Sequence, residues 1–169
     1  MSVLGLGLDL VEVEPFARQL SVVGTSFTES TFTPGELARA RAVDGPGTPA
    51  VARHLAARFA AKEAFVKAWS MARRGAPPAM DGVAWHDLEV VVDDWGRPSL
   101  HVGGPTLQRL RETLGDVEVV VSLTHEDTVA GAVVVLTPRP DRPAQDAGVT
   151  SVAASAGSAR PGEGRGAVR

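Results

Sequence analysis

The chain has 169 residues, of which 44% are hydrophobic, enough for one domain with a core of its own. A formal net charge of −3 excludes a strongly basic surface that would attract nucleic acid or a membrane. The absence of cysteine excludes disulfides, thiol catalysis and cysteine-ligated zinc, and agrees with a reducing cytoplasm.

The first predicted element is a strand over residues 3–13, in which leucines alternate with other residues. The leucines at positions 4, 6, 8 and 10 share one face. The opposite face begins with two glycines, which leave room for something to approach the backbone closely, and continues with Asp9. We expect Asp9 to point into that space rather than into the leucine layer. Because Asp9 and Glu12 come early and no basic region precedes them, we expect neither a signal peptide nor a membrane span.

Three helices are predicted next. Pro15 can open a short helix that ends at Leu20, and the capping-box pattern of residues 33–36 begins a second one. A long helix begins at Thr48-Pro49 and ends near Arg73. Its apolar stripe, at helical spacing, consists of Val51, Leu55, Phe59, Val66 and Trp69.

Four charged residues of the long helix do not follow the usual amphipathic pattern. Lys62 falls inside the apolar stripe, Arg58 beside it and Glu63 at one edge, with Lys67 one turn beyond Glu63. Unpaired buried charge is costly, so these groups need partners. One interpretation is a polyanionic ligand held with a metal. The other is that Lys62 and Arg58 extend past the core edge to solvent while Glu63 and Lys67 form an i,i+4 pair.

In the second half of the chain, the sequence pattern predicts a loop over residues 76–86 and two hairpins. Strands are expected at residues 88–92 and 99–102, then a helix at 106–114, then strands at 117–123 and 129–136 with His125 at the hairpin tip. This order predicts an α+β fold, with a mostly antiparallel sheet packed on one long helix. Trp85 and Trp95 are expected in the core, and His54 and His86 in structural or surface positions.

The composition changes after Thr137. Residues 138–169 are rich in Pro, Ala and Gly and have no apolar periodicity, so they cannot bury enough surface to offset the entropy of ordering. We predict a domain of residues 1–137 followed by a disordered tail.

Candidate site residues come from the strand, the long helix and the last hairpin. Asp9 and Glu63 are a candidate Mg²⁺ pair, because two carboxylates with phosphate oxygens and waters are a common octahedral set. Arg58, Lys62 and Lys67 are candidate phosphate ligands. The last hairpin adds three weaker candidates for binding a cofactor: Ser122, Thr124 and His125. His125 can equally be an exposed turn residue.

Four motifs in one order then resemble a known family. They are Gly5-Leu6-Gly7-Leu8-Asp9-Leu10-Val11-Glu12, Phe32-Thr33 with Glu36, the run from Arg58 to Ala68, and Ser122-Leu123-Thr124-His125-Glu126 with Ala130 and Ala132. Over residues 3–137 the chain is similar to the holo-[acyl-carrier-protein] synthases, the small class of 4′-phosphopantetheinyl transferases. Residues 53–58 and 94–98 resemble the actinobacterial members in particular.

The resemblance implies transfer of 4′-phosphopantetheine from coenzyme A to a carrier-protein serine, in fatty-acid or polyketide synthesis in the cytoplasm. It implies that Asp9 and Glu63 bind Mg²⁺ on the pyrophosphate, that Lys67 assists the leaving phosphate, and that Arg58, Lys62 and His125 lie near the nucleotide. It also implies a homotrimer whose three sites lie at subunit interfaces, with the first strand and the long helix of a site contributed by different subunits. The general base is left open between Glu63 and a metal-bound water.

Two departures affect the expected docking of an acidic carrier protein. Pro15, and Ser30-Thr31 before the Phe-Thr pair, stand where many members have arginine, and Arg18, Arg39 or Arg41 are candidate replacements. Two alternative functions stay open: a non-catalytic trimeric module that binds coenzyme A or a nucleotide, and a Mg²⁺-dependent nucleotide pyrophosphatase that uses water.

Overall fold

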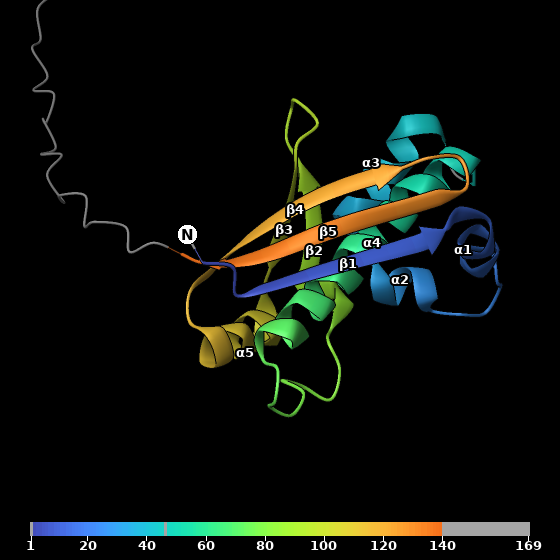
Figure 1. Ribbon diagram of the computed structural model, residues 1–169. Coiled ribbons are helices and arrows are strands. Elements are labelled where there is room, and N and C mark those ends of the chain that lie inside the picture. The colour runs from blue at the N-terminus through green and yellow to red at the C-terminus, as the bar shows by residue number, and fades with distance from the viewer. Residues whose placement is uncertain (1, 46, 140–169) are drawn as a thin grey trace, which may run out of the picture. The chain divides into compact units, whose positions relative to one another are not determined.

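The computed structural model describes residues 2–45 and 47–139 (Figure 1). Strands β1 (Gly5–Glu12), β5 (Val129–Pro138) and β4 (Val117–His125) form an antiparallel sheet in the order β1-β5-β4. Strands β2 (Leu88–Val92) and β3 (Pro98–Val102) pair in a second antiparallel sheet. The predicted α+β class is confirmed, with the strands divided between two sheets. The predicted tail lies outside the described residues except for its first two positions, and the first of these, Pro138, still belongs to β5.

The helices begin close to the predicted caps. Thr33 Oγ1 accepts from the backbone N of Glu36 while the Glu36 carboxylate accepts from the backbone N of Thr33, and Thr48 Oγ1 accepts from the backbone N of Val51. Within the described residues, no helix is long and apolar enough to cross a membrane. The helices are α1 (Val13–Leu20), α2 (Phe27–Thr31), α3 (Pro34–Asp44), α4 (Pro49–Ala72), the 3-10 turn η1 (Trp85–Asp87) and α5 (Gly104–Leu114). Helix α2 was not predicted, because five residues are too few to show a period.

Helix α4 packs directly on the glycine face of β1. A Cβ added to Gly5 would lie 2.1 Å from the Ala68 carbonyl oxygen, and one added to Gly7 would lie 2.0 Å from that of Ala64. Glycines on the strand and alanines on the helix therefore let the two backbones approach closely. The feature that fills the predicted space is α4 itself.

The leucine face of β1 points away from α4. Leu6, Leu8 and Leu10 are 47%, 52% and 64% exposed. The leucine layer is therefore not part of the core of the described chain, whereas Asp9 is on the face that α4 covers. Strict alternation identified the two faces correctly but did not show which of them the core would cover.

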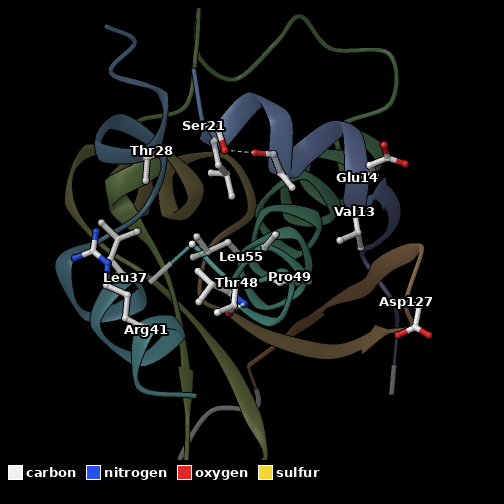
Figure 2. A pocket seen from close by; sticks show the side chains of 15 residues that line it. Val13, Glu14, Ser21, Thr28, Leu37, Arg41, Thr48, Pro49, Leu55 and Asp127 are labelled. Carbon is white, nitrogen blue, oxygen red and sulfur yellow. Dashed lines mark hydrogen bonds between the residues drawn. The ribbon is translucent and has the colours of Figure 1, made fainter. Parts of the chain in front are cut away.

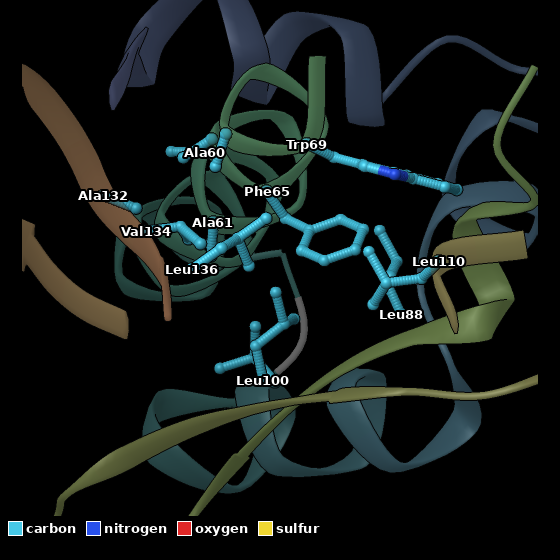
Figure 3. Close-up of a cluster of buried hydrophobic side chains, with 13 residues drawn as sticks. Ala60, Ala61, Phe65, Trp69, Leu88, Leu100, Leu110, Ala132, Val134 and Leu136 are labelled. Carbon is cyan, nitrogen blue, oxygen red and sulfur yellow. The ribbon is translucent and has the colours of Figure 1, made fainter. Parts of the chain in front are cut away.

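Two hydrophobic clusters stabilise the fold on opposite halves of α4. One lies between α4, the three-stranded sheet and the β2–β3 hairpin, where Phe65 points from α4 toward Leu88 and Leu110 (Figure 3). The other joins α1, α2 and α3 to the first half of α4. Trp69 is 3% exposed, as expected for a core residue. The prediction for Trp95 is wrong: it lies at the β2–β3 turn, 78% exposed, with the Arg97 guanidinium 4.9 Å from its ring.

Candidate active site

Three of the predicted residues meet where β1 crosses α4. Lys67 Nζ lies 2.7 Å from Asp9 Oδ1 and 3.3 Å from the Leu8 carbonyl oxygen. Glu63 precedes Lys67 by one helical turn and so faces the same way. Burial, and secondly the nearby Asp9 carboxylate, raise the pKa of Glu63 above its ordinary value, while Lys67 opposes the shift. The structure thus brings Asp9, Glu63 and Lys67 together within one chain.

This carboxylate–lysine cluster of Asp9, Glu63 and Lys67 fits a divalent cation held by two protein ligands. Burial first, and then repulsion by the neighbouring Asp9 carboxylate, raise the pKa of Glu63, and a bound cation would offset both. Magnesium is usually bound by one or two carboxylates, with phosphate oxygens and waters completing its octahedron. In the described part of the chain, no group of three or more His, Cys, Asp or Glu side chains is placed to hold a metal ion. Further ligands for a cation at Asp9 and Glu63 would therefore come from a substrate or from water.

An aromatic wall that the sequence did not predict borders the same site. A hollow of about 330 Å³ is lined by Asp9 and Glu63 together with Pro15, Phe16 and Phe59. The rings of Phe16 and Phe59 are 5.5 Å apart. Phe59 was expected in the core, but it is half-buried and lines the hollow. The only available signal in the sequence was that Phe59 precedes Glu63 by four residues, about one helical turn, so that the two share a face of α4.

Lys62, expected to bind phosphate, has its ammonium bonded within the described chain. Lys62 Nζ donates to the Thr31 carbonyl oxygen at 2.7 Å, to Glu36 Oε2 at 2.8 Å and to the Trp85 carbonyl oxygen at 3.1 Å. Both side chains of the Lys62–Glu36 pair are 0% exposed. Since an ammonium has three hydrogens, Lys62 has none left for a ligand. Burial lowers the pKa of Lys62, and the Glu36 carboxylate opposes that shift.

A second group of basic residues lies where α4 passes the end of β4. It consists of Arg53, His54, Arg58 and His125, and we call it the basic cluster. The His54 and His125 rings are 5.1 Å apart, and Arg58 Nη1 donates to the His54 carbonyl oxygen at 3.0 Å. Ser122 and Thr124 are exposed and occupy the opposite face of β4, because Thr124 pairs with Gly131 while His125 pairs with the buried Ala130. The structure therefore does not bring Ser122 and Thr124 together with His125.

The two clusters lie on opposite sides of α4. Nine residues separate His54 from Glu63, which is about two and a half helical turns and therefore points the two side chains in opposite directions. The strand order β1-β5-β4 also places Asp9 on one edge strand and His125 on the other. One expectation must be corrected: the first strand and the long helix of the carboxylate–lysine cluster belong to the same chain, not to two subunits.

A mostly apolar cavity of the described chain lies elsewhere. It has a volume of about 460 Å³ and is lined by α1, α3 and the first two turns of α4, which contribute Val13, Leu37 and Leu55 among others (Figure 2). None of the predicted catalytic, metal-binding or cofactor-binding residues lines it. We therefore place the candidate active site at the carboxylate–lysine cluster.

The fold and this site define an α+β protein with two carboxylates and a lysine suited to a divalent cation and a phosphate ester. The family model described as the 4′-phosphopantetheinyl transferase superfamily matches residues 5–132, and the chain belongs to this superfamily. The resemblance drawn from the four motifs is thereby confirmed.

Individual relatives are similar over nearly their whole length. The holo-[acyl-carrier-protein] synthase of Mycolicibacterium smegmatis is 47% identical over 136 residues, which are 80% of this chain and 98% of the relative. A solved complex of the Chronobacterium ammoniagenes synthase with CoA is 40% identical, with a TM-score of 0.72 over 80% of this chain and 97% of that one. The Mycobacterium tuberculosis acyl carrier protein synthase structure is 41% identical, with a TM-score of 0.62 over 82% of this chain and 100% of that one.

Proposed function

We propose that this protein transfers 4′-phosphopantetheine from coenzyme A to a serine of an apo acyl carrier protein and releases adenosine 3′,5′-bisphosphate. The observation that carries the proposal is the 47% identity to a holo-[acyl-carrier-protein] synthase over almost all of that relative. The joint placement of Asp9, Glu63 and Lys67 in one cluster supports it. The reaction breaks the pyrophosphate P–O bond to the leaving nucleotide and forms a P–O bond to the serine, whose proton is lost.

Mg²⁺ is part of the proposal, with Asp9 and Glu63 as its protein ligands. When bound, a divalent cation neutralises charge on the pyrophosphate oxygens. Lys67 lies beside the same carboxylates, so its ammonium can stabilise charge that develops on the leaving phosphate. The raised pKa of Glu63 also suits it to accept the serine proton, directly or through a metal-bound water.

We further propose that the protein is a homotrimer whose neighbouring copies complete each active site. The basic cluster lies across α4 from Asp9 and Glu63, and this placement supports a site in which the two clusters come from different copies. A neighbouring copy can supply the nucleotide-binding residues Arg58 and His125. Leu6, Leu8 and Leu10 form an exposed apolar surface on the sheet, of the kind that symmetric association covers. The number three comes from the family resemblance.

The metabolic pathway and the cellular compartment of the reaction are proposed from the family resemblance alone. We propose that the carrier protein belongs to fatty-acid or polyketide synthesis and that the reaction takes place in the cytoplasm.

The direct test is the intact mass of an apo acyl carrier protein after incubation with the protein, coenzyme A and Mg²⁺. The carrier should gain one phosphopantetheine, and adenosine 3′,5′-bisphosphate should appear in equal amount. A nucleotide pyrophosphatase would instead release free phosphopantetheine without any carrier. A binding module would leave coenzyme A intact. Either result, with several fatty-acid and polyketide carriers tried, would refute the proposal.

A further inference from the structure

His54 was expected to be structural or on the surface, yet it makes a specific contact with a candidate nucleotide-binding residue. It lies half-buried on α4, and its ring meets that of His125 at 5.1 Å with an interplanar angle of 67°. The backbone oxygen of His54 is also the acceptor for Arg58 Nη1. His54 therefore contacts both members of the basic cluster that the resemblance places near the nucleotide.

The surroundings of this histidine pair favour an anion. Arg53 and Arg58 flank it on α4. The acidic groups described near these arginines are Asp127, which pairs with Arg53 at 3.2 Å and is 96% exposed, and the buried Glu36, whose charge acts on Arg58. Arg58 is only 6% exposed, and among the described residues no acceptor reaches its Nε. A buried guanidinium nitrogen without an acceptor is costly, and the oxygen of a bound anion would satisfy it.

We propose that His54 is a binding residue in its own right, pairing with His125 to hold the phosphomonoester of the nucleotide. This inference rests on the proposed function, in which coenzyme A carries one pyrophosphate and one phosphomonoester. The pyrophosphate belongs to the carboxylate–lysine cluster, so the phosphomonoester needs a separate cationic site. Two imidazoles together with Arg53 and Arg58 give that site four side chains able to donate hydrogen bonds to phosphate oxygens.

The pair has a distinctive protonation behaviour. Burial, then the charges of Arg58, His125 and Arg53, lower the pKa of His54 below its ordinary value of 6.5, which favours the neutral imidazole in the free protein. A phosphate dianion placed against it removes that penalty, because an opposite charge favours the protonated imidazole. Binding of the phosphomonoester should therefore take up a proton from solvent.

The test compares adenosine 3′,5′-bisphosphate with adenosine 5′-monophosphate by titration calorimetry on the full chain in buffers of different ionisation enthalpy. His54→Phe keeps an aromatic ring against His125 and removes the donor. His101→Phe is the matched control, because His101 is exposed on β3 with a Ser99 contact and outside both clusters. We expect His54→Phe to lose about tenfold or more in affinity for the bisphosphate, little for the monophosphate, and to reduce proton uptake.

The outcomes separate this inference from the proposed function. If His54→Phe melts like the wild type but keeps its preference for the bisphosphate and its proton uptake, His54 only packs against His125 and the inference is wrong. If the variant melts early, His54→Gln, which keeps a donor, should restore part of the preference, and failure to do so contradicts the inference. Carrier modification at saturating coenzyme A reports on the proposed function, whichever result His54 gives.

Discussion

At the scale of single residues, the candidate site contains a carboxylate that is costly to keep charged. Glu63 lies half-buried beside Asp9, and its pKa is raised above the ordinary value of 4.5. The folded chain therefore binds this proton more tightly than the unfolded chain does. The contribution of Glu63 to stability is greatest below pH 4.5 and falls as pH rises through the raised pKa.

A first prediction follows for Glu63→Gln. Without Mg²⁺, the variant should melt above the wild type at pH 7 and above, because it no longer places a second negative charge beside Asp9. The difference should shrink as pH falls toward 4.5. Adding Mg²⁺ should raise the melting temperature of the wild type more than that of the variant, because the ion needs both carboxylates. Thermal melts across pH, with and without Mg²⁺, check this; a variant less stable than wild type at every pH contradicts it.

The second prediction separates the metal ligands from the lysine. Asp9→Ala and Glu63→Ala should each lose most turnover. The loss in the double variant should be far less than the two single losses combined, because one missing ligand already disables the shared ion. High Mg²⁺ should partly rescue either single variant. Lys67→Ala should lose about a hundred- to a thousandfold without such rescue. Turnover of each variant is measured against Mg²⁺ concentration. A normal Mg²⁺ dependence for Asp9→Ala would show that Asp9 binds no metal.

The third prediction concerns the buried Lys62–Glu36 pair, which joins residues 26 apart. The Glu36 carboxylate also accepts from the backbone N of Thr33 and of Val90, so α3, α4 and β2 are tied together at one carboxylate. Lys62→Met should cost about 3–5 kcal/mol of unfolding free energy, because it leaves Glu36 charged, buried and without its cation. Lys62→Met with Glu36→Gln should recover part of that loss.

Urea denaturation measures both variants of this pair. The exposed pair of Arg111 and Asp116 supplies the control, because Arg111→Met there should change stability by less than about 1 kcal/mol. If Lys62→Met is as harmless as the control, the buried pair does not contribute to stability as described.

At the scale of elements, the close approach of β1 to α4 positions Asp9 against Glu63 and Lys67. This approach depends on Gly7, since a Cβ there would meet the Ala64 carbonyl oxygen at 2.0 Å, a contact with backbone that cannot move aside. Ala64 itself is 0% exposed. The element packing and the site geometry therefore rest on the same small residues.

The fourth prediction is that Gly7→Ala destabilises the fold by about 3 kcal/mol or more and displaces Asp9 from Lys67. Gly82→Ala is the matched control, because a Cβ at Gly82 meets nothing within 4 Å. Melting temperature and carrier modification are measured for both variants. Normal stability of Gly7→Ala would show that the strand and helix can separate without cost.

At the scale of the whole molecule, the question is which parts of the site one chain can supply. Asp9, Glu63 and Lys67 are joined within a single chain. The basic cluster faces the other side of α4. If both clusters bind one coenzyme A, as proposed, we expect them to belong to neighbouring copies.

The fifth prediction is that two inactive variants complement each other. Glu63→Gln lacks a working carboxylate–lysine cluster and Arg58→Met lacks a working basic cluster, so homogeneous samples of each should modify carrier protein poorly. Co-expressed in equal amounts, they should regain about a quarter of wild-type turnover, because random mixing leaves that share of interfaces with both clusters intact. Light scattering should report a trimer. No recovery in mixed trimers would place both clusters of a site in one chain.

The sequence by itself determined much of the local structure and predicted the pairing of Asp9 with Glu63. Capping residues Thr33 and Thr48 defined the helix starts, alternation defined the strands, and Asp9 and Glu63 could be paired by their chemistry. These signals are local, because caps and periodicity depend on residues within a few positions of each other. Even so, β1 showed two distinct faces without showing which one the core would cover.

Only the tertiary structure decided how distant residues combine. A lysine on an apolar stripe predicts a partner but cannot say whether that partner is a ligand or a residue such as Glu36, because buried charge is satisfied equally by either. The positions of His54 and Ser122 relative to His125 likewise depend on how β4 lies beside α4. His54 faces His125, and Ser122 faces away from it. Contacts between residues far apart in sequence depend on packing geometry, which no local pattern encodes.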